Sequence, residues 1–363
     1  MSIDFKRILL DKSNICEACS VADFNNDGNL EIICGEYMYF GKDFSSKRKI
    51  CSIKQEHGYL HDFSDYPLDV NGDGFLDIVT GSWWSGGLFW RENPKNDTDE
   101  WVTHKITDTS NVETIRFFDI DNCGTVEVFP NNPEEPQAYY KLIKDAQGKP
   151  TAKFEKYLIG GTRNAGHGLG FGDISGNGKI DIILSGGWLE QPDDVYAENW
   201  TFHEDFSIPS ASIPIICYDL NNDGLNDLIV GAGHNFGLWW LEQKIENGVR
   251  KFIKHEIDME NSQYHDMQLL DVDNDGELEL ITGARHFAHN GKDPGELNPI
   301  GVYVFKYDKT NNIFIKHILN FGPAETTSGT GIYFWPVDLN GNGKIDLVMP
   351  GKEGLYLFMN ECK

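Results

Sequence analysis

The chain has 363 residues and a formal net charge of −26 at pH 7, because 57 acidic side chains outnumber 31 basic ones. A surface this negative repels nucleic acids and acidic lipid head groups, and no apolar run approaches the roughly 18 residues that cross a bilayer. The 40% of hydrophobic residues is enough for a sizeable core. We therefore expect a soluble protein with no nucleic-acid and no membrane partner, and with a surface that attracts cations.

The N-terminus and the cysteines bear on the cellular location. Only three apolar residues, Ile8 to Leu10, precede Asp11, which is too short for the core of a secretory signal. The seven cysteines are odd in number and scattered, a pattern that favours reduced thiols over a disulfide framework. We expect a cytoplasmic protein, and export after removal of a leader is the alternative.

In chain order, the first predicted element is a strand over about residues 4–11. An acidic motif of the form D-x-[DN]-x-[DN]-G-x-x-[DE] follows, and related copies recur towards the end of the chain. Each copy runs directly into residues of β-strand composition, such as Ile32 and Ile33. An aromatic strand comes next, as at 87–90, and then a mixed strand, as at 101–106. The seven copies begin at Asp23, Asp69, Asp119, Asp173, Asp219, Asp271 and Asp338.

Four strands in each of seven units predict an all-β, seven-bladed β-propeller that occupies residues 1–363 as a single domain. The last unit ends after its aromatic strand near Phe358, one strand short of four. The segment 4–11 has the pattern of the missing outermost strand. We therefore expect this segment to close the last blade and to remove both sheet edges.

The repeated motif is typical of a calcium-binding loop between two strands. Oxygen atoms at positions 1, 3, 5 and 9 suit a hard cation, and glycine at position 6 permits a sharp turn. The sixth copy has four carboxylates, the fourth and seventh have two each, and the third has Cys123 at position 5. We expect structural Ca²⁺ in several loops, with Mg²⁺ as an alternative and with weak or no binding in the third, fourth and seventh. The candidate ligands are Asp23, Asn25, Asp27, Glu31, Asp69, Asn71, Asp73, Asp77, Asp119, Asp121, Glu127, Asp173, Asn177, Asp181, Asp219, Asn221, Asp223, Asp227, Asp271, Asp273, Asp275, Glu279, Asp338, Asn340, Asn342 and Asp346.

These loops resemble the FG-GAP (VCBS) repeats of integrin α-subunit propellers and of many microbial propellers. The resemblance extends over all seven units and implies the propeller fold. It implies no single function, because such propellers serve adhesion, lectin and lyase functions alike.

The distribution of histidines indicates which face of the ring carries function. If each acidic loop joins the first strand of a unit to the second, the other connections lie on the opposite face, where variable loops converge on a rigid scaffold. His167 and His265 stand six residues before an acidic loop, where other units hold Glu17 and Glu113. We interpret the seven histidines of these connections as a functional cluster. Four others recur in the mixed outer strands and are interpreted as structural, namely His104, His203, His255 and His317.

Neutral imidazoles together with a carboxylate suit a catalytic Zn²⁺ or another divalent ion with one position open to substrate. Aromatic faces next to polar groups suit sugar rings. The candidate metal ligands or bases are His167, His265 and His286, with His234 as their partner and with Tyr264 or Glu113 as the acid. The candidate substrate-binding residues are His61, Trp84, Trp188 and His289.

Three segments carry a narrower resemblance. Residues 166–173, 237–243 and 265–289 are similar to the propeller part of the aldos-2-ulose dehydratase (1,5-anhydro-D-fructose dehydratase) group. The resemblance covers mainly the fourth to sixth units, and it implies a zinc-type site and the elimination of water from a keto sugar. The fungal enzymes also carry cupin domains, for which this chain has no residues, so the resemblance does not extend to their isomerase activity.

Two classes of function are consistent with these features. The first is a metal-dependent carbohydrate lyase or dehydratase that performs β-elimination on a keto sugar, a keto-glycoside or a uronate-containing sugar. The second is a non-catalytic propeller that binds glycans or protein, in the manner of a lectin or an integrin. A lectin should repeat its binding residues in several units, whereas here these positions differ from unit to unit, which favours one active site. The pattern indicates neither the particular sugar nor the oligomeric state.

Overall fold

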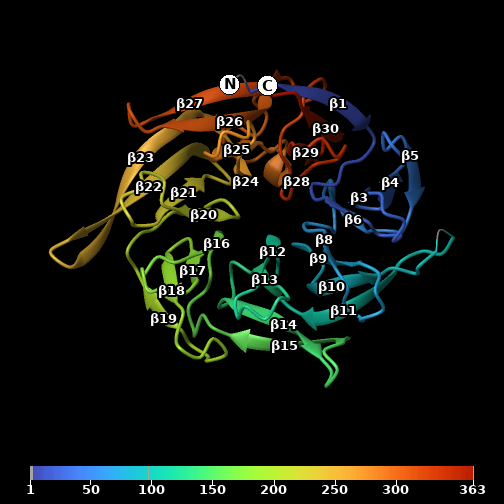
Figure 1. Ribbon diagram of the computed structural model, residues 1–363, viewed down its shortest axis with the longest axis horizontal. Helices are drawn as coiled ribbons and strands as arrows, with labels where there is room; N and C mark the ends of the chain where they lie inside the picture. Colours follow the sequence, from blue (N-terminus) through green and yellow to red (C-terminus); the bar gives the residue numbers. More distant parts are fainter. Residues whose placement is uncertain (1–2, 97, 363) are drawn as a thin grey trace.

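The computed structural model describes residues 3–96 and 98–362. Within these ranges the protein is all-β, with one short 3₁₀ turn, η1 (Ala288–Asn290), and with no helix long and apolar enough to span a membrane. The strands form five sheets of four strands, one of eight and one of two. Figure 1 shows these sheets standing around a central axis, with the chain passing from sheet to sheet around the ring.

Four of the sheets consist of strands that follow one another along the chain. The first contains β2 (Ser20–Ala22), β3 (Glu31–Cys34), β4 (Tyr37–Phe40) and β5 (Ser46–Lys49), and the second contains β8 (Tyr66–Leu68), β9 (Asp77–Gly81), β10 (Gly87–Glu92) and β11 (Val102–Asp108). The third contains β12 (Thr114–Phe118), β13 (Glu127–Asn131), β14 (Ala138–Lys144) and β15 (Pro150–Leu158). The fourth contains β24 (Tyr264–Leu270), β25 (Glu279–Ala284), β26 (Ile300–Asp308) and β27 (Ile313–Gly322).

The eight-stranded sheet is two such runs of four strands joined by parallel pairing of their first strands, β16 and β20. Between β5 and β8 the chain forms the small two-stranded sheet of β6 (Gln55–Glu56) and β7 (Tyr59–Leu60). The bounds in the eight-stranded sheet are β16 (Leu169–Gly172), β17 (Asp181–Leu184), β18 (Gly187–Glu190), β19 (Thr201–His203), β20 (Ile215–Tyr218), β21 (Asp227–Gly231), β22 (Phe236–Glu246) and β23 (Val249–Ser262).

The remaining sheet joins the two ends of the described chain. It contains β28 (Trp335–Val337), β29 (Asp346–Met349) and β30 (Leu355–Asn360), followed by β1 (Phe5–Asp11) as its outermost strand. β1 pairs antiparallel with β30, so that Phe5 lies opposite Asn360. Figure 1 accordingly shows both chain ends at the same edge of the ring.

The second strand of each four-stranded run begins with the carboxylate of motif position 9. These side chains are at most 2% exposed, and each accepts a hydrogen bond of 2.8–3.3 Å from the backbone N–H at motif position 2. Burial raises the pKa of Glu31, Asp77 and Glu127 to about 7. The rest of these strands is buried aliphatic sequence, which places the core between neighbouring sheets.

Each acidic loop is closed by its own first aspartate, whose Oδ2 accepts the backbone N–H of the position-6 glycine at 2.7–3.0 Å. The seven glycines have φ between 80° and 89°, a region that side chains with a Cβ rarely adopt. This hydrogen bonding accounts for the constant Asp and Gly of the motif independently of any bound ion.

Lysine ammonium groups lie among the carboxylates of several loops. In the sixth loop, Nζ of Lys306 lies 3.1 Å from Asp273, 2.6 Å from Asp275 and 2.9 Å from Glu279. The loop with the most carboxylates therefore already holds an internal cation, which its composition does not indicate. The corresponding contacts in other loops join Lys95 to Asp73, Lys141 to Asp121 and Glu127, and Lys244 to Asp223.

Three outer strands repeat one arrangement of tryptophan, histidine and glutamate. In the β22–β23 hairpin the His255 ring stacks on Trp240 with centroids 4.6 Å apart, and its Nε2 lies 3.0 Å from Glu242. Equivalent contacts join His104 to Trp90 and Glu92, and His203 to Trp188 and Glu190. These contacts agree with the structural interpretation of His104, His203 and His255, whereas His317, the fourth histidine so interpreted, lies opposite Val304.

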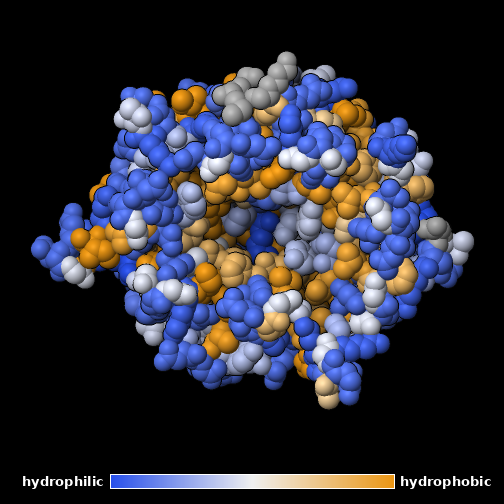
Figure 2. Space-filling model, in the orientation of Figure 1, coloured by the Kyte–Doolittle hydropathy of each residue, from blue (hydrophilic) through white to orange (hydrophobic). Residues whose placement is uncertain are grey.

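Arg116 ties several sheets together at the centre of the ring. Its Nη2 donates to the backbone oxygen of Ile213, to Oδ1 of Asp266 at 2.7 Å and to the backbone oxygen of Ile332 at 3.3 Å. Its guanidinium also lies 4.2 Å from the ring centroid of Tyr333. In Figure 2 the centre of the ring is hollowed, and hydrophilic residues lie at the bottom of the hollow.

Candidate functional site

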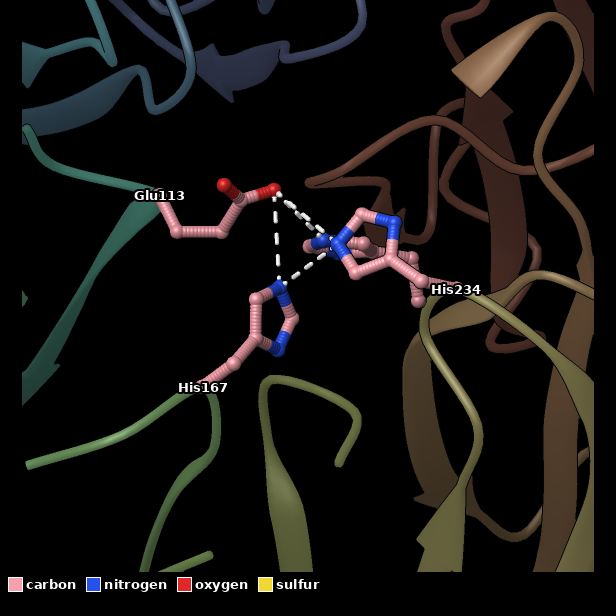
Figure 3. A group of neighbouring side chains, drawn as sticks. Glu113, His167 and His234 are labelled. Atoms are coloured by element: carbon pink, nitrogen blue, oxygen red, sulfur yellow. Dashed lines mark hydrogen bonds and ion pairs between the residues drawn. The ribbon is translucent and has the colours of Figure 1, made fainter. Parts of the chain in front are cut away.

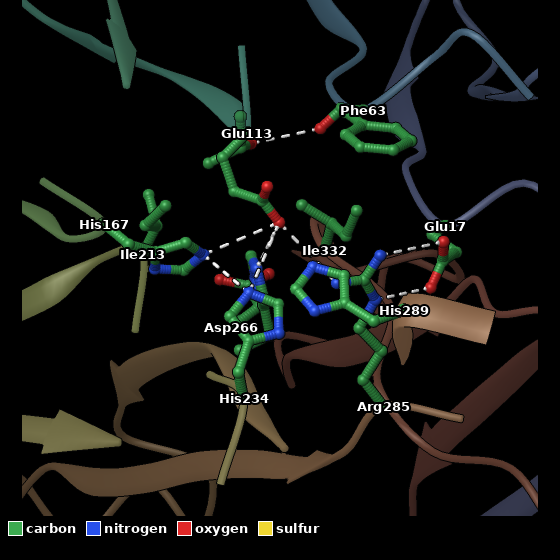
Figure 4. Close-up of polar contacts among 12 residues, drawn as sticks. Glu17, Phe63, Glu113, His167, Ile213, His234, Asp266, Arg285, His289 and Ile332 are labelled. Carbon is green, nitrogen blue, oxygen red and sulfur yellow. Dashed lines mark hydrogen bonds and ion pairs between the residues drawn. The ribbon is translucent and has the colours of Figure 1, made fainter. Parts of the chain in front are cut away.

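The site is built from one repeated position, the residue six places before each acidic loop. These residues lie at or just before the first strands of their sheets, whereas the acidic loops follow those strands. The two sets therefore lie on opposite faces of the ring. Figure 4 shows the labelled members of the set, from different sheets, around a common centre. The seven residues are Glu17, Phe63, Glu113, His167, Ile213, His265 and Ile332.

Two of these histidines and a third one converge on Glu113 (Figure 3). Oε1 of Glu113 lies 2.9 Å from Nε2 of His265, 3.6 Å from Nε2 of His167 and 3.9 Å from Nε2 of His234. His234 comes from the connection between β21 and β22, on the same face. All four potential ligand atoms lie within 4.8 Å of one another. We call Glu113, His167, His234 and His265 the His₃Glu group.

Hydrogen bonds at Nδ1 fix the orientation of the His167 and His234 rings. Nδ1 of His167 lies 2.7 Å from the backbone oxygen of Ala211, and Nδ1 of His234 lies 2.7 Å from Oδ2 of Asp293. Both partners accept hydrogen bonds, so Nδ1 of each ring carries a proton. Nε2 of His167 and Nε2 of His234 lie 2.9 Å apart, and two neutral rings in this arrangement direct their lone pairs at each other. A cation or an extra proton between the rings is needed to remove this repulsion.

Burial controls the charges in the group. It lowers the pKa of His234 to about 4 and that of His265 well below the usual range, so these rings are neutral near pH 7. Burial alone would raise the pKa of Glu113, but contacts with His167 and His265 outweigh it and hold this pKa well below its ordinary value. Glu113 is therefore a carboxylate suited to bind a cation, a state that favours a ligand role over the predicted role of proton donor.

A buried ion-pair network adjoins the group (Figure 4). Arg285, just after β25, donates from Nε and Nη2 to the two carboxylate oxygens of Glu17 at 2.7 and 3.2 Å, and its Nη1 lies 3.6 Å from Oε1 of Glu113. Nζ of Lys352 lies 3.8 Å from Glu17 and 3.3 Å from the ring centroid of Tyr59. Burial lowers the pKa of Lys352 to about 8.

Asp293 links two histidines of the same face. While its Oδ2 accepts from Nδ1 of His234, its Oδ1 lies 2.9 Å from Nδ1 of His289. The two rings stack with centroids 4.2 Å apart. His289 is half-exposed, which leaves its other nitrogen open to a ligand.

An aromatic pocket opens beside Glu113. Its walls come from the segments at β7 and at the β9–β10 connection on one side, and from Glu113, Arg285 and His289 on the other. Trp84, one of the predicted substrate-binding residues, packs within 4.9 Å of the Tyr59 ring and also stacks on His61. The aromatic wall consists of Tyr59, Phe63, Trp83 and Trp84.

Three predicted site residues lie elsewhere. Tyr264 precedes His265 in one strand, so its side chain points to the other face, where its hydroxyl donates to Asp258 at 2.9 Å in a hydrophobic core. Trp188 is 1% exposed and stacks on the His203 ring, so it belongs to the core rather than to a substrate surface. His286 is outside the His₃Glu group, and its Nδ1 is buried without a hydrogen-bond partner.

Other residues were missed as site members. Arg285 and Asp293 lie in the long connection after β25, and Lys352 lies between β29 and β30. Their signal in the sequence is weak, because a charged residue in a connection is usually solvated. Only the burial and the contacts of these three side chains distinguish them.

Comparison with known proteins identifies the repeat. Residues 219–282 match the family described as FG-GAP-like repeat, which confirms that resemblance for this segment. No curated protein sequence matches the chain.

Solved structures share the fold at low sequence identity. The exotype rhamnogalacturonan lyase YesX is 10% identical with a TM-score of 0.54, over 99% of this chain and 75% of that one. The rhamnogalacturonan lyase YesW is 12% identical with a TM-score of 0.52, over 98% and 75%. BBS1N, solved in complex with ARL6DN, is 11% identical with a TM-score of 0.52, over 98% and 96%. The chain therefore has a β-propeller-like fold, which lyases share with a protein crystallised in a complex.

Proposed function

We propose that the chain is a seven-bladed β-propeller that binds a divalent transition-metal ion at the His₃Glu group and acts as a carbohydrate lyase. The observation that carries this proposal is the pair of Nε2 atoms, on His167 and His234, that lie 2.9 Å apart next to the carboxylate of Glu113. Three imidazoles with one carboxylate are a donor set suited to Zn²⁺ and similar ions. The partners of the two outer nitrogens orient the rings as in known metal sites.

A bound divalent ion would supply an electrophile for a substrate oxygen next to the carbon that loses its proton. His289 is the residue best placed to accept that proton, because Asp293 holds its Nδ1 and the ring lines the aromatic pocket. In a β-elimination the electrons of the C–H bond form the C=C bond. The C–O bond then breaks, and the departing oxygen leaves with its electron pair and is protonated.

The acidic loops are proposed to hold Ca²⁺ for structural purposes, with Mg²⁺ as the alternative. The loop that offers four carboxylates has three of them, on Asp273, Asp275 and Glu279, paired with Lys306. We infer that Ca²⁺ competes with this ammonium group there. The first loop, with Asp23, Asp27 and Glu31, contains no such lysine contact among the described residues.

Metal analysis of purified protein tests the proposed centre. The wild-type protein should hold one transition-metal ion per chain. His234→Ala should lose this ion, because the substitution removes a ligand atom and the ring that contacts Asp293. His255→Ala is the matched control, because this histidine is also paired with a carboxylate but lies in an outer strand. Wild type with calcium alone, or equal metal content in His234→Ala, would contradict the proposal.

The reaction is tested by incubating metal-loaded protein with keto sugars, including 1,5-anhydrofructose, and with uronate-containing oligosaccharides. Elimination produces a conjugated double bond that is followed by ultraviolet absorbance. We expect product with the loaded wild type and a large loss with His289→Ala. Metal binding without any product would favour the non-catalytic glycan- or protein-binding alternative, since BBS1N, which has the same fold, was solved in a complex.

A further inference from the structure

The aromatic pocket beside the His₃Glu group is lined by Arg285, which has a hydrogen-bond donor without a partner. Arg285 is 2% exposed, and its Nε and Nη2 are both used by Glu17. Its Nη1 is buried without a hydrogen-bond partner, and the nearest carboxylate oxygen, on Glu113, is 3.6 Å away. A buried guanidinium N–H with no acceptor is costly, so this atom is suited to receive an oxygen from a ligand.

The charges around the pocket favour a negatively charged ligand. Among the residues that line the pocket, Glu113 carries a negative charge and Arg285 a positive one, so these two charges cancel. A divalent ion at the His₃Glu group would leave the pocket with an excess of positive charge. An anionic oxygen near Nη1 of Arg285 would neutralise this positive charge in a site with little water.

The opposite wall suits a sugar ring. Tyr59, Phe63, Trp83 and Trp84 present aromatic surface within one pocket, and aromatic rings pack against the C–H faces of sugars. Lys352 and Arg285 both lie over the ring of Tyr59, at 3.3 and 5.6 Å from its centroid. The apolar wall and the charged wall are thereby held in a fixed relation.

We propose that this pocket is the subsite for a hexuronate ring, with the sugar against the aromatic wall and its carboxylate on Nη1 of Arg285. This inference rests on the proposed function, because the positive charge that favours an acid comes from the metal ion. Within that function it selects uronate-containing sugars over neutral keto sugars.

Binding measurements on the metal-loaded protein test the proposal directly. Isothermal titration with glucuronate, galacturonate, glucose, galactose and 1,5-anhydrofructose should show a uronate bound at least roughly tenfold more tightly than any neutral sugar. Trp84→Ala should weaken binding of every sugar that binds. Arg285→Gln should abolish the preference for the acid while residual binding of neutral sugars stays similar.

Two further variants keep the test valid if Arg285→Gln folds poorly. Glu17→Gln combined with Arg285→Gln removes both partners of the buried pair and should show the same loss of preference. Arg250→Gln is the control, because this arginine packs over Trp188, away from the pocket, and should leave binding unchanged.

Each outcome separates the subsite from the metal centre. If loaded wild type binds neutral sugars as well as uronates, prefers 1,5-anhydrofructose, or binds no sugar, the inference is overturned while the metal centre stands. An unchanged uronate preference in Arg285→Gln and in the double variant also overturns it. If the wild type takes up no transition metal, the proposed function fails first, and titration of the metal-free protein should then show no preference for the acid.

Discussion

Glu353 illustrates how burial sets the charge of a single side chain in this molecule. It lies in the connection between β29 and β30, is buried, and accepts the backbone N–H of Gly329 at 2.6 Å. Burial raises its pKa to about 7. Because this pKa is above that of an exposed glutamate, the folded chain retains a proton that the unfolded chain has already released.

Glu353→Gln should therefore change the pH dependence of stability. Between the unfolded pKa of about 4.5 and the folded pKa of about 7, the wild type loses stability as the pH rises, since the unfolded state binds fewer protons. The variant should be more stable than wild type by roughly 1–3 kcal/mol at pH 8 and by little at pH 4. Urea unfolding at both pH values measures this difference, and an equal effect at both would refute it.

The side chains of the candidate site could be predicted only where the repeat fixes their direction. His167, His265 and Glu113 share the position six residues before an acidic loop, so the repeat alone brings them together. Tyr264 is adjacent to His265 in a strand and therefore faces away. His286 lies in an irregular connection, where neighbouring Phe287 has φ of 51°, and no repeat determines where such a side chain points.

At the scale of elements, the strands themselves were predictable and the irregular pieces were not. The acidic loop, the buried second strand and the aromatic third strand recur with a pattern that identifies them. The hairpin of β6 and β7 consists of two-residue strands, which are too short to show any periodicity. This hairpin nevertheless supplies Tyr59 to the aromatic pocket.

Lys306→Gln tests the ammonium group in the sixth loop. Removing the positive charge leaves the carboxylates of Asp273, Asp275 and Glu279 without their internal partner, so this loop should bind Ca²⁺ more tightly, by roughly tenfold. Titration with Tb³⁺, read by luminescence, and competition with Ca²⁺ measure the change.

Lys309→Gln is the control for this variant. Its ammonium group pairs with Glu277 outside the set of position 1, 3, 5 and 9 ligands. Equal Ca²⁺ affinity of the wild type and the Lys306 variant would show that the ammonium group does not compete with the ion.

The stacked histidines of the outer strands should contribute only to the stability of the fold. His255→Ala removes the ring from Trp240 and the contact with Glu242, at a cost of about 1 kcal/mol in the free energy of unfolding. His317→Ala should cost less, because in the strand register His317 lies opposite Val304 rather than a tryptophan. Chemical denaturation compares the two, and a larger cost for His317→Ala would contradict the structural role of stacking.

For the whole molecule, removal of loop cations should lower thermal stability. The chain carries a formal charge of −26, and many of its carboxylates are gathered in the acidic loops. Chelation leaves these carboxylates to repel one another. The melting temperature measured by calorimetry should therefore fall by roughly 5–10 °C and recover when Ca²⁺ is added back. A melting temperature that chelation does not change would mean that the hydrogen bonds of the loops suffice without ions.

The pairing of β1 with β30 also dictates an order of events during protein synthesis. Asp4 and Cys362, which are hydrogen bonded to each other, are separated by 358 residues, so all the residues between them are synthesised before this sheet can form. Until then β1 has no partner strand, and the nascent ring stays open to pairing with other chains. Closure is thus a late, long-range step that depends on an early segment remaining free. Any binding partner that occupies residues 5–11 during translation would hold the molecule in an unclosed form.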